Sequence, residues 1–544
     1  MNSSNRQQVY TVYTWSTMDD DHETGSVRGD LCERVVAPAS AMRVGAGRSL
    51  CVVVAAVLAA CATNPSAVDC EAGRACPTER DAGNPGADAD VDAEMPMDAA
   101  RLDDGSPPWD DAGSASADAE VGTDGGPRTI TSVERESRTL VCKLISGDEL
   151  GYESDNRTHT RFNLRGTDLG IPAIVGDDLT LFFGDTHGWR DIWRVGEDPD
   201  SVARVSLSAA RADLRALCDQ LDFYVTADTP SVAAAGDPSI LRDFEGAYLT
   251  APPGERIRDY IDRPVPFFET ETGSFAGSFE VPAGALGRPD GAYVFWATRP
   301  GTGSIGPMRL SFLARWAGGP RLNQQILYPL DDLAWGRPLG GHFLQVSPVE
   351  RDGFLYLFGT GEYRRDGVHV ARKPIAQIDV PGGFELYDPR LGDWIAATSI
   401  GADERAAIPA VLDEDVRGIG ELGVQYVDSA GLFVMMFQQL SDTSGGNNMV
   451  LSVAQRPEGP WTSVPIITMH DPLFAARHCC VGDRCPGEQI LHCDRAGLYG
   501  IYPLPLIEST RTSEGVVLDV PFTASTWQPY NVVLFRTRVL VRGL

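Results

Sequence analysis

Basic side chains are scarce in this chain of 544 residues: 46 Lys and Arg stand against 76 Asp and Glu, and the formal net charge is −30. Proteins that bind phosphate backbones need a basic surface, so the charge balance argues against nucleic acid as a partner. It equally disfavours direct docking to an anionic lipid surface. The sequence also contains neither a Walker loop nor an HExxH motif, the signals that point to phosphate binding or to a zinc protease.

Long hydrophobic runs are missing as well. The apolar run at residues 50–58 is too short to cross a bilayer as a helix, which takes about 20 apolar residues. Arg43 and Arg48 precede this run and small residues follow it, which is the layout of a secretory signal. The run ends in Leu-Ala-Ala before Cys61, a pattern that resembles a bacterial lipobox and implies cleavage before Cys61 and acylation of its thiol.

We therefore predict a lipoprotein signal peptide at residues 42–60, which starts at Met42, and we interpret residues 1–41 as a mis-annotated upstream extension. A short buried helix that happens to end in cysteine is the alternative. The signal predicts an exported protein that is held to the cell envelope by lipid on Cys61. By analogy with bacterial sorting rules, Ala62 at the next position favours the outer membrane.

Large apolar residues are rare from residue 61 to residue 138, where Asp, Ala, Gly, Pro and Ser dominate. Such a segment cannot bury enough apolar area to offset the entropy of ordering it, and its like charges keep it extended. We predict a disordered acidic tether here. Much of the negative charge belongs to this tether, so the charge says little about the surface of the folded part.

Helical periodicity is also rare. Residues 139–544 contain short apolar runs broken by Gly, Pro, Asp and Asn, the pattern of strands and turns. Residues 206–221 are the one convincing amphipathic helical stretch. The expected fold class is therefore all-β, with long loops and one short helix.

A two-strand pattern recurs through this domain: an aromatic-rich strand is followed by a strand that ends in Ala-Arg or Ala-Gln. The pairs lie at 293–296 with 310–316, 356–359 with 368–372, and 433–437 with 450–455. Residues 179–186 open a fourth candidate unit, and residues 531–541 close a last one. About five such units over about 400 residues predict a five-bladed β-propeller, with a two-sheet sandwich as the competing architecture.

Several short motifs within the domain resemble, in order and spacing, the bacterial family catalogued as domain of unknown function 4185. They are GTDLGIP at 166–172, LFFGDTHG at 181–188, FEVPAGAL at 279–286, FLYLFGTGEYR at 354–364, GIGELGVQY at 418–426, PEGPW at 457–461, YGIYPLP at 499–505 and TWQPYNVVLFR at 526–536. The likeness runs from about residue 140 to the C-terminus. It implies a five-bladed propeller related to furanosidases, in a family of which some members are glycoside hydrolases that cut D-arabinan internally.

Hydrolysis of a glycosidic bond needs two carboxyl groups, one on each side of the bond. Asp168 lies in a Gly-flanked turn before an apolar strand, and Asp185 lies at the end of the next strand. Glu421 lies among Gly and apolar neighbours, where partial burial would raise its pKa and suit a general acid. We predict Asp168 as base or nucleophile, Glu421 as acid and Asp185 in support; turn capping by the aspartates and an ion pair of Glu421 with an Arg of a neighbouring blade are the alternatives.

Weaker candidates complete the predicted substrate site. Arg372 could orient a carboxylate through its fork of donors, and His187 could contact substrate or an ion on the axis. Trp527 and Tyr530 could stack on a sugar ring, although aromatic residues of strands more often belong to the core. Glu362 is also a candidate, with an ion pair to Arg364 as its structural alternative.

The ligand that these residues imply is a furanose-containing polysaccharide such as arabinan, with a non-catalytic glycan- or protein-binding propeller as the alternative. No cofactor is required by this chemistry, and whether a metal ion lies on the axis is left open.

The six cysteines of residues 139–544 lack the paired CxxC spacing of structural zinc sites, and in an exported protein they predict three disulfides. We expect Cys142 to pair with Cys218 and two bridges to form among Cys479, Cys480, Cys485 and Cys493.

Overall fold

The structure is a computed structural model. It describes residues 129–146, 154–188, 200–225, 246–247, 249–250, 274–275, 281–298, 308, 310–319, 322–332, 338–413, 418–440, 448–469, 471–482, 484–494 and 496–544. The predicted signal peptide, Cys61 and the tether as far as residue 128 lie outside the described residues. None of the helices in the described part of the chain has the length and apolar composition that crossing a membrane requires.

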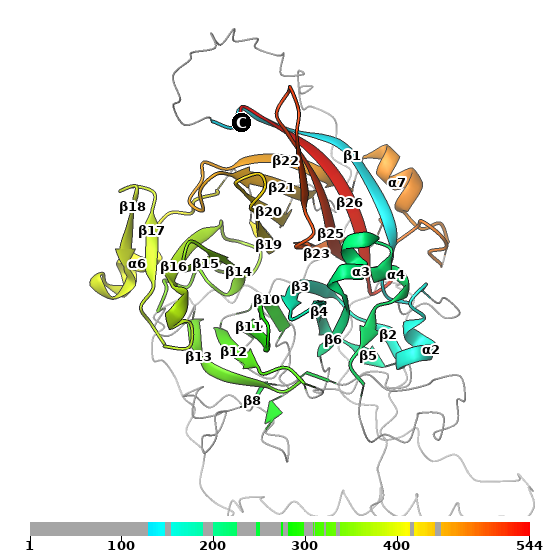
Figure 1. The fold of residues 1–544 in the computed structure, drawn as a ribbon, viewed down its shortest axis with the longest axis horizontal. Helices are drawn as coiled ribbons and strands as arrows, with labels where there is room; N and C mark the ends of the chain where they lie inside the picture. Colours follow the sequence, from blue (N-terminus) through cyan, green and yellow to red (C-terminus); the bar gives the residue numbers. More distant parts are fainter. Residues whose placement is uncertain are drawn as a thin grey trace, which may run out of the picture. The chain divides into compact units, whose positions relative to one another are not determined.

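Five sheets, here called blades 1 to 5 in chain order, stand around a common axis (Figure 1). Their innermost strands are β3 (Leu169–Val175), β10 (Val281–Arg288), β14 (Gln345–Arg351), β19 (Ile419–Val427) and β23 (Leu498–Pro503). The second strands are β4 (Asp178–Asp185), β11 (Gly291–Thr298), β15 (Phe354–Thr360), β20 (Leu432–Gln439) and β25 (Val516–Thr526). The third strands are β6 (Asp200–Ser206), β12 (Leu310–Trp316), β16 (His369–Pro374), β21 (Asn448–Ala454) and β26 (Asn531–Arg542). The fourth strands are β7 (Asp222–Phe223), β13 (Gln324–Asp332), β17 (Glu385–Asp388), β22 (Thr462–Thr468) and β1 (Ser132–Lys143).

The innermost strands contact one another in a closed ring, in the order β3, β10, β14, β19, β23 and back to β3. The predicted five-bladed β-propeller is therefore confirmed. Each of the three complete predicted strand pairs forms the second and third strands of one blade.

The ring is closed by the two ends of the folded domain. β1 pairs antiparallel with β26 along almost its whole length, from Ser132 opposite Arg542 to Lys143 opposite Val533. Figure 1 shows these two strands side by side, although they lie at opposite ends of the domain in sequence. Because β1 begins at Ser132, residues 132–138 belong to the propeller and not to the tether, which corrects the predicted boundary at residue 139.

Smaller elements extend or connect the blades. The additional strands are β2 (Leu164–Gly166) with β5 (His187–Gly188) beside blade 1, β8 (Leu249–Thr250) and β9 (Ser274–Phe275) on blade 2, β18 (Asp393–Ala396) on blade 3 and β24 (Glu508–Arg511) on blade 5. The described helices are α2 (Thr158–Phe162), α3 (Leu207–Ala212), α4 (Ala216–Asp219), α6 (Ala402–Ala406) and α7 (Pro472–His478), with 3-10 turns η2 (Ile375–Gln377) and η3 (Ala397–Ser399). The amphipathic stretch at 206–221 thus forms two short helices instead of one, because the chain is extended at Asp213.

Five hydrophobic clusters hold the blades together, one between each pair of neighbouring blades. Successive side chains of a strand point to opposite faces of its sheet. In β20, Phe433 and Met435 accordingly pack toward blade 3, whereas Val434 and Met436 pack toward blade 5. Both faces of a middle blade strand must therefore be apolar, and this is why the sequence shows continuous apolar runs instead of a strict alternation with polar residues.

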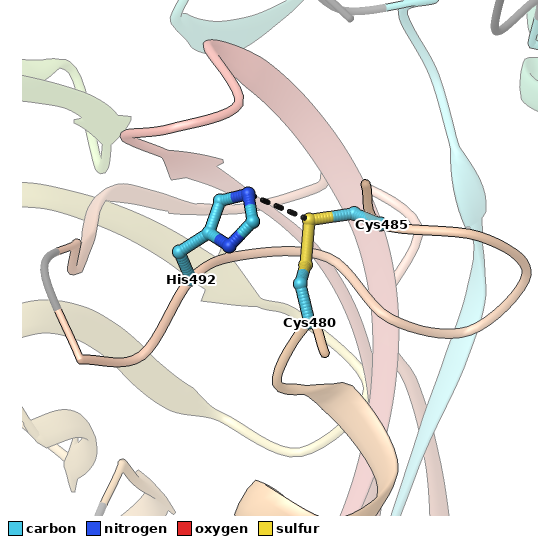
Figure 2. Close-up of side chains that lie close together, drawn as sticks. All are labelled: Cys480, Cys485 and His492. Atoms are coloured by element: carbon cyan, nitrogen blue, oxygen red, sulfur yellow. Dashed lines mark hydrogen bonds between the residues drawn. A yellow bond between two sulfur atoms is a disulfide. The ribbon is translucent and has the colours of Figure 1, made fainter. Parts of the chain in front are cut away.

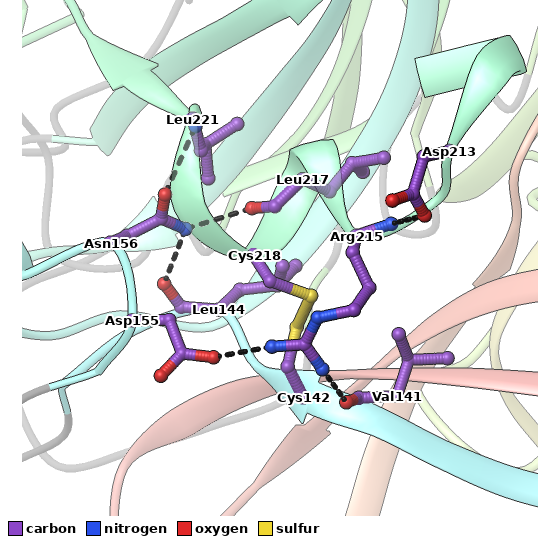
Figure 3. The surroundings of a disulfide bond; sticks show 10 residues. All are labelled: Val141, Cys142, Leu144, Asp155, Asn156, Asp213, Arg215, Leu217, Cys218 and Leu221. Carbon is purple, nitrogen blue, oxygen red and sulfur yellow. Dashed lines mark hydrogen bonds and ion pairs between the residues drawn. A yellow bond between two sulfur atoms is a disulfide. The ribbon is translucent and has the colours of Figure 1, made fainter. Parts of the chain in front are cut away.

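Three disulfides occur in the described residues: the predicted pair of Cys142 with Cys218, and two bridges among the other four cysteines, whose pairing the sequence left open. Cys479 pairs with Cys493, and Cys480 pairs with Cys485 (Figure 2). Cys142 of β1 pairs with Cys218 of α4 (Figure 3). Beside this last bridge, the buried side chain of Asn156 donates to the carbonyls of Leu144 and Leu217, so a hydrogen-bond network joins the same two segments as the disulfide.

We predict that replacing Cys142 and Cys218 together by serine lowers the free energy of unfolding by about 4 kcal/mol, because the disulfide closes a long loop in the unfolded chain. The two cysteines are 76 residues apart in sequence, whereas Cys480 and Cys485 are only 5 apart. Replacing that second pair is the control, with an expected loss of about 2 kcal/mol. Urea unfolding followed by near-ultraviolet circular dichroism measures both values, and a larger loss from the control pair would contradict the prediction.

Candidate active site

The candidate site lies at the end of the ring where the innermost strands begin. In an antiparallel blade this end also carries the loop between the second and third strands. Asp168 directly precedes β3, Glu421 lies near the start of β19, and Tyr499 lies near the start of β23. The loop after β15 supplies Tyr363 and Arg364, and the loop after β25 supplies Tyr530. Side chains that are far apart in sequence thus meet at one end of the axis.

A tight turn presents Asp168. The next two residues, Leu169 and Gly170, both have left-handed backbone conformations, with φ of 65° and 78°. Leu169 is not glycine, so this conformation stores strain, and the hydrogen bond from its N–H to Ser525 Oγ at 2.7 Å helps to hold it. Gly184 of the FGDT motif leaves the space for the carboxylate, because a Cβ atom there would lie 2.3 Å from Asp168 Oδ1. The GTDLG and FGDT motifs are therefore two halves of one local structure.

Asp168 is a buried carboxyl with a raised pKa. Its side chain is only 8% exposed, and burial raises its pKa to about 6. Hydrogen bonds from Tyr530 and Tyr499 oppose this rise, and the negative charge of Glu421 adds to it. The Tyr499 hydroxyl donates to Asp168 Oδ2 at 2.9 Å. Asp168 therefore changes its protonation near neutral pH, where a general acid is useful.

Glu421 is buried too, but it is held in the ionised form. Arg364 donates to its Oε1 at 2.9 Å, and the Tyr363 hydroxyl donates to the same oxygen at 3.0 Å. Burial raises the pKa of Glu421, but the charge and hydrogen bonds of Arg364 outweigh it, so the pKa lies below its ordinary value. The predicted rise was wrong for this reason. The alternative, an ion pair with an arginine of the neighbouring blade, is what the structure shows.

The arginine approaches Glu421 closely because of a glycine. Gly418 has φ of 142°, and a Cβ atom at this position would lie 2.1 Å from the carbonyl oxygen of Arg364. The loop that carries Tyr363 and Arg364 therefore lies directly against the start of β19. The Arg364 guanidinium also lies over the ring of Tyr499, 5.6 Å from its centroid.

Four tyrosines surround the two carboxylates. Burial raises the pKa of each hydroxyl well above its usual range, and nearby carboxylates add to the rise. They are Tyr363, Tyr499, Tyr502 and Tyr530. These hydroxyls therefore stay protonated. Tyr363 donates to Glu421, and Tyr499 and Tyr530 donate to Asp168. The sequence motifs GTGEYR and YGIYPLP contained three of them and Arg364, but nothing in the sequence showed that they face a carboxylate of another blade.

Three further predicted residues lie around Tyr530. The His187 ring lies 5.3 Å from the Tyr530 ring, and the charge of His187 lowers the pKa of Asp168. Asp185 is close enough for its charge to contribute to the raised pKa of Tyr530. Trp527 packs edge-on against Tyr530 at 5.7 Å and remains 47% exposed, the largest aromatic surface at this edge of the described site. The structure therefore brings His187, Asp185, Trp527 and Tyr530 to one side of Asp168.

Two predicted residues lie elsewhere. Arg372 lies on the third strand of blade 3, where its guanidinium binds Glu385 at 2.8 Å and covers the ring of Trp394. Glu362 is exposed and forms an ion pair with Arg365 at 3.0 Å, not with Arg364. Each is thus engaged by a partner on its own blade, and its role in substrate binding stays a prediction.

Two groups of described side chains bring possible metal ligands within 4.8 Å of one another. In the first group, Cys480 and Cys485 form a disulfide and have no thiolate to offer. In the second, the rings of His342 and His369 stack at 3.6 Å with 14° between their planes, so their in-plane lone pairs run side by side and do not converge on one point. Both rings instead contact the carboxylate of Asp366, at 3.1 and 3.5 Å.

Asp366 anchors the loop that supports Glu421. Its carboxylate accepts hydrogen bonds from the N–H groups of Gly361 and Gly367, on either side of Tyr363 and Arg364. Burial raises the pKa of Asp366, but its contacts with His342 and His369 outweigh this and lower it. We interpret this group as part of the support of the candidate site.

A cavity of about 400 Å³ lies at the other end of the ring. It is lined by the last residues of the innermost strands, among them Ile174, Leu286, Val349 and Gln425. None of its lining residues is one of the carboxylates or tyrosines described above. The cavity and the candidate site are therefore separate features of the axis.

We predict that Asp168→Asn stabilises the protein at pH 8 by up to about 3 kcal/mol, because a folded-state pKa of about 6 makes ionisation of the buried carboxyl costly. The sign follows from the direction of the shift. A raised pKa favours the protonated folded state, so this cost is absent below about pH 4 and develops as the pH rises to about 6. Urea unfolding at pH 4.5, 6 and 8 measures the difference, which should grow with pH. A constant difference would contradict the raised pKa.

Glu421→Gln provides the matched comparison, and we expect it to lower the free energy of unfolding instead of raising it. Its replacement leaves Arg364 without its carboxylate, and we expect a loss of about 2 kcal/mol at pH 8, reduced from the value for a fully buried pair because the Arg364 side chain is 30% exposed. Equal effects of the two amide substitutions would show that their electrostatic environments do not differ as described.

Part of the chain matches a known protein family. Residues 315–536 match the family described as "Domain of unknown function (DUF4185)". These residues include Glu421, Arg364 and the four tyrosines, whereas Asp168 and Asp185 precede them. No curated protein matches the sequence.

Solved structures with a similar fold include the native arabinanase of Bacillus subtilis, which is 10% identical over 69% of this chain and 96% of that chain, with a TM-score of 0.33. A GH43_1 enzyme from Xanthomonas citri is 11% identical over 74% of this chain and 90% of that chain, with a TM-score of 0.33. A glycosyl hydrolase from Bacteroides ovatus is 11% identical over 75% and 94%, with a TM-score of 0.35. The match to the family described as a domain of unknown function, DUF4185, thus covers blades 3 and 4 and parts of blades 2 and 5 of this propeller.

Proposed function

We propose that this propeller is a glycoside hydrolase that acts on a furanose-containing polysaccharide such as arabinan. The observation that carries the proposal is the contrast between Asp168 and Glu421. Both carboxyls are buried at the same end of the axis, but the pKa of one is raised to about 6 and that of the other is lowered. Two carboxyl groups whose environments separate their pKa values are the usual means of dividing acid and base roles.

We propose roles opposite to those that the sequence suggested. Asp168, protonated up to about pH 6, is the group that can give a proton to the glycosidic oxygen. Tyr499 and Tyr530 then donate hydrogen bonds to the carboxylate that this step leaves behind. Glu421 is already ionised and can stabilise positive charge on the sugar, attack it, or activate water. Asp185 stays in support, through its proximity to Tyr530.

The second candidate is a non-catalytic propeller that binds a glycan or a protein. The observation in its favour is that Glu421 already has two donors, Arg364 and Tyr363, as a purely structural carboxylate would. A fold of this kind hosts many functions, so the architecture does not decide between the two. Activity measurements can decide between the two candidates.

We expect the full chain to release oligosaccharides from D-arabinan or L-arabinan, and Asp168→Asn to lower kcat by about 10³-fold, since general acid catalysis typically contributes 10²–10⁴. If Asp168 is the acid, the wild-type rate should fall as the pH rises above about 6, because the carboxyl then loses its proton. Glu421→Gln should also abolish most activity.

Glu362→Gln is the matched control. It makes the same acid-to-amide change on an exposed residue whose partner is Arg365, and activity should be unchanged. Retained binding without products from either arabinan, in the wild type and in all three variants, would favour the non-catalytic propeller.

We also propose that the propeller is held to the cell envelope by lipid on Cys61, at the end of the predicted signal peptide. Two or three acyl chains would anchor it stably, because each buried CH₂ contributes about 0.8 kcal/mol. When the full chain is expressed in a bacterium, it should partition into the membrane fraction, and Cys61→Ala should release it. Membrane association that is unaffected by Cys61→Ala would contradict the anchor.

A further inference from the structure

A loop between α7 and β23 carries four of the cysteines. We call residues 478–497 the cystine loop; the structure describes all of them except 483 and 495. Its two disulfides start from adjacent residues, Cys479 and Cys480, and return to Cys493 and Cys485. The N–H of Cys480 donates to the carbonyl of Leu491 at 2.8 Å and ties the two sides of the loop together. The loop is therefore cross-linked both covalently and by its backbone.

His492 connects the cross-linked loop to the candidate site. Its Nε2 lies 3.7 Å from Cys485 Sγ, so the imidazole rests against the Cys480–Cys485 disulfide (Figure 2). Both Cys485 and His492 are buried, with 1% and 6% exposure. On its other side, the N–H of His492 donates to the carbonyl of Gln528 at 3.1 Å.

Gln528 belongs to the segment that presents the aromatic edge of the site. It has φ of 57°, a conformation that a residue other than glycine adopts only when its surroundings impose it. Three hydrogen bonds surround it: His492 N–H to its carbonyl, Trp527 N–H to the carbonyl of Gly497 at 3.2 Å, and Thr526 Oγ1 to the carbonyl of Pro529 at 2.7 Å. Two of the three come from the cystine loop, so this loop imposes the conformation.

The segment carries an aromatic residue of the candidate site on each side of Gln528. Trp527 is the exposed ring, and Tyr530 donates to Asp168 and packs against His187. A shift of the segment would move both rings at once. The path from the disulfides to Asp168 thus runs through His492 and its hydrogen bond to Gln528, then along the chain to Tyr530, which donates to Asp168.

We infer that the cystine loop is a positioning element: it holds Trp527 as a platform for a sugar ring of the substrate and keeps the Tyr530 hydroxyl on Asp168. The role in sugar binding rests on the proposed function, whereas the role in holding residues 526–530 does not. The loop therefore acts on specificity and on the acid through Trp527 and Tyr530, without touching substrate at its disulfides.

The test that needs no substrate is hydrogen–deuterium exchange of the full chain. In a Cys480→Ser, Cys485→Ser double variant, we expect the amides of His492 and Trp527 to exchange about tenfold faster, because their acceptors lie across the loosened contact. His492→Ala, which keeps both disulfides, should produce a smaller increase in the same amides. This second variant keeps the test decisive if the double variant folds poorly.

The matched control removes the disulfide between Cys142 and Cys218, which lies outside the cystine loop. Cys142→Ser with Cys218→Ser breaks a bridge whose described surroundings include none of residues 526–530, and exchange of these amides should stay at the wild-type rate (Figure 3). Unchanged exchange in both cystine-loop variants, or an equal increase in the control, would overturn the inference.

A substrate readout separates the inference from the proposed function. On a polysaccharide that the wild type cleaves, Trp527→Ala should raise KM by about tenfold with little change in kcat, because one stacking platform is lost. The cystine-loop variants should in addition move the alkaline limb of the pH profile upward, since Asp168 loses a donor that holds its pKa down. If the wild type cleaves no polysaccharide, the proposed function fails, and the exchange result alone tests the inference. If the wild type cleaves but both cystine-loop variants keep its KM and pH profile, the positioning role fails.

Discussion

No blade of this protein can cover both of its own apolar faces. The middle strands are apolar on both sides, as β20 shows with Phe433 and Met435 toward one neighbour and Val434 and Met436 toward the other. Each blade therefore needs two neighbours, and only a closed ring provides them for all five. The pairing of β1 with β26 supplies that closure, and the disulfide between Cys142 and Cys218 ties the closing strand to blade 1.

The candidate site is a consequence of the same closure. A ring of antiparallel blades places the starts of all innermost strands and the loops between second and third strands at one end of the axis. Asp168 of blade 1 and Glu421 of blade 4 meet there, and each is surrounded by tyrosines from other blades. Their different pKa values come from their burial and their partners: Glu421 has the cation Arg364 at hydrogen-bond distance, whereas the hydroxyls of Tyr530 and Tyr499 and the charge of His187 do not outweigh the burial of Asp168.

Two strained backbone positions support Asp168. Leu169 and Gln528 both have left-handed backbone conformations although neither is glycine, and both belong to segments that contact or adjoin Asp168. Such conformations persist only where surrounding structure imposes them. Ser525 holds the first, and the cystine loop holds the second. The placement of Asp168 is thus supported by Ser525 of blade 5 and by the cystine loop that leads into this blade.

Repeated aromatic strands were enough to predict about five blades, and an even set of cysteines in the folded domain was enough to predict three disulfides, one of them the pair of Cys142 with Cys218. Local signals of this kind work because each blade repeats the same pattern of buried residues and each turn carries its own chemistry. They also pointed to Asp168, Asp185, His187 and Tyr530, which lie in or beside the motifs GTDLG, FGDT and TWQPY, and whose role in a functional site stays a prediction.

Only the tertiary structure decided which carboxyl has the raised pKa and which residues surround it. Arg364 and Glu421 are 57 residues apart in sequence, and Tyr499 and Asp168 are 331 apart. The pKa of a carboxyl depends on burial and on charges within a few ångströms, and the chain brings those charges from other blades. A motif determines that a carboxylate stands at a turn, but the arginine or hydroxyl that sets its charge comes from a different part of the ring.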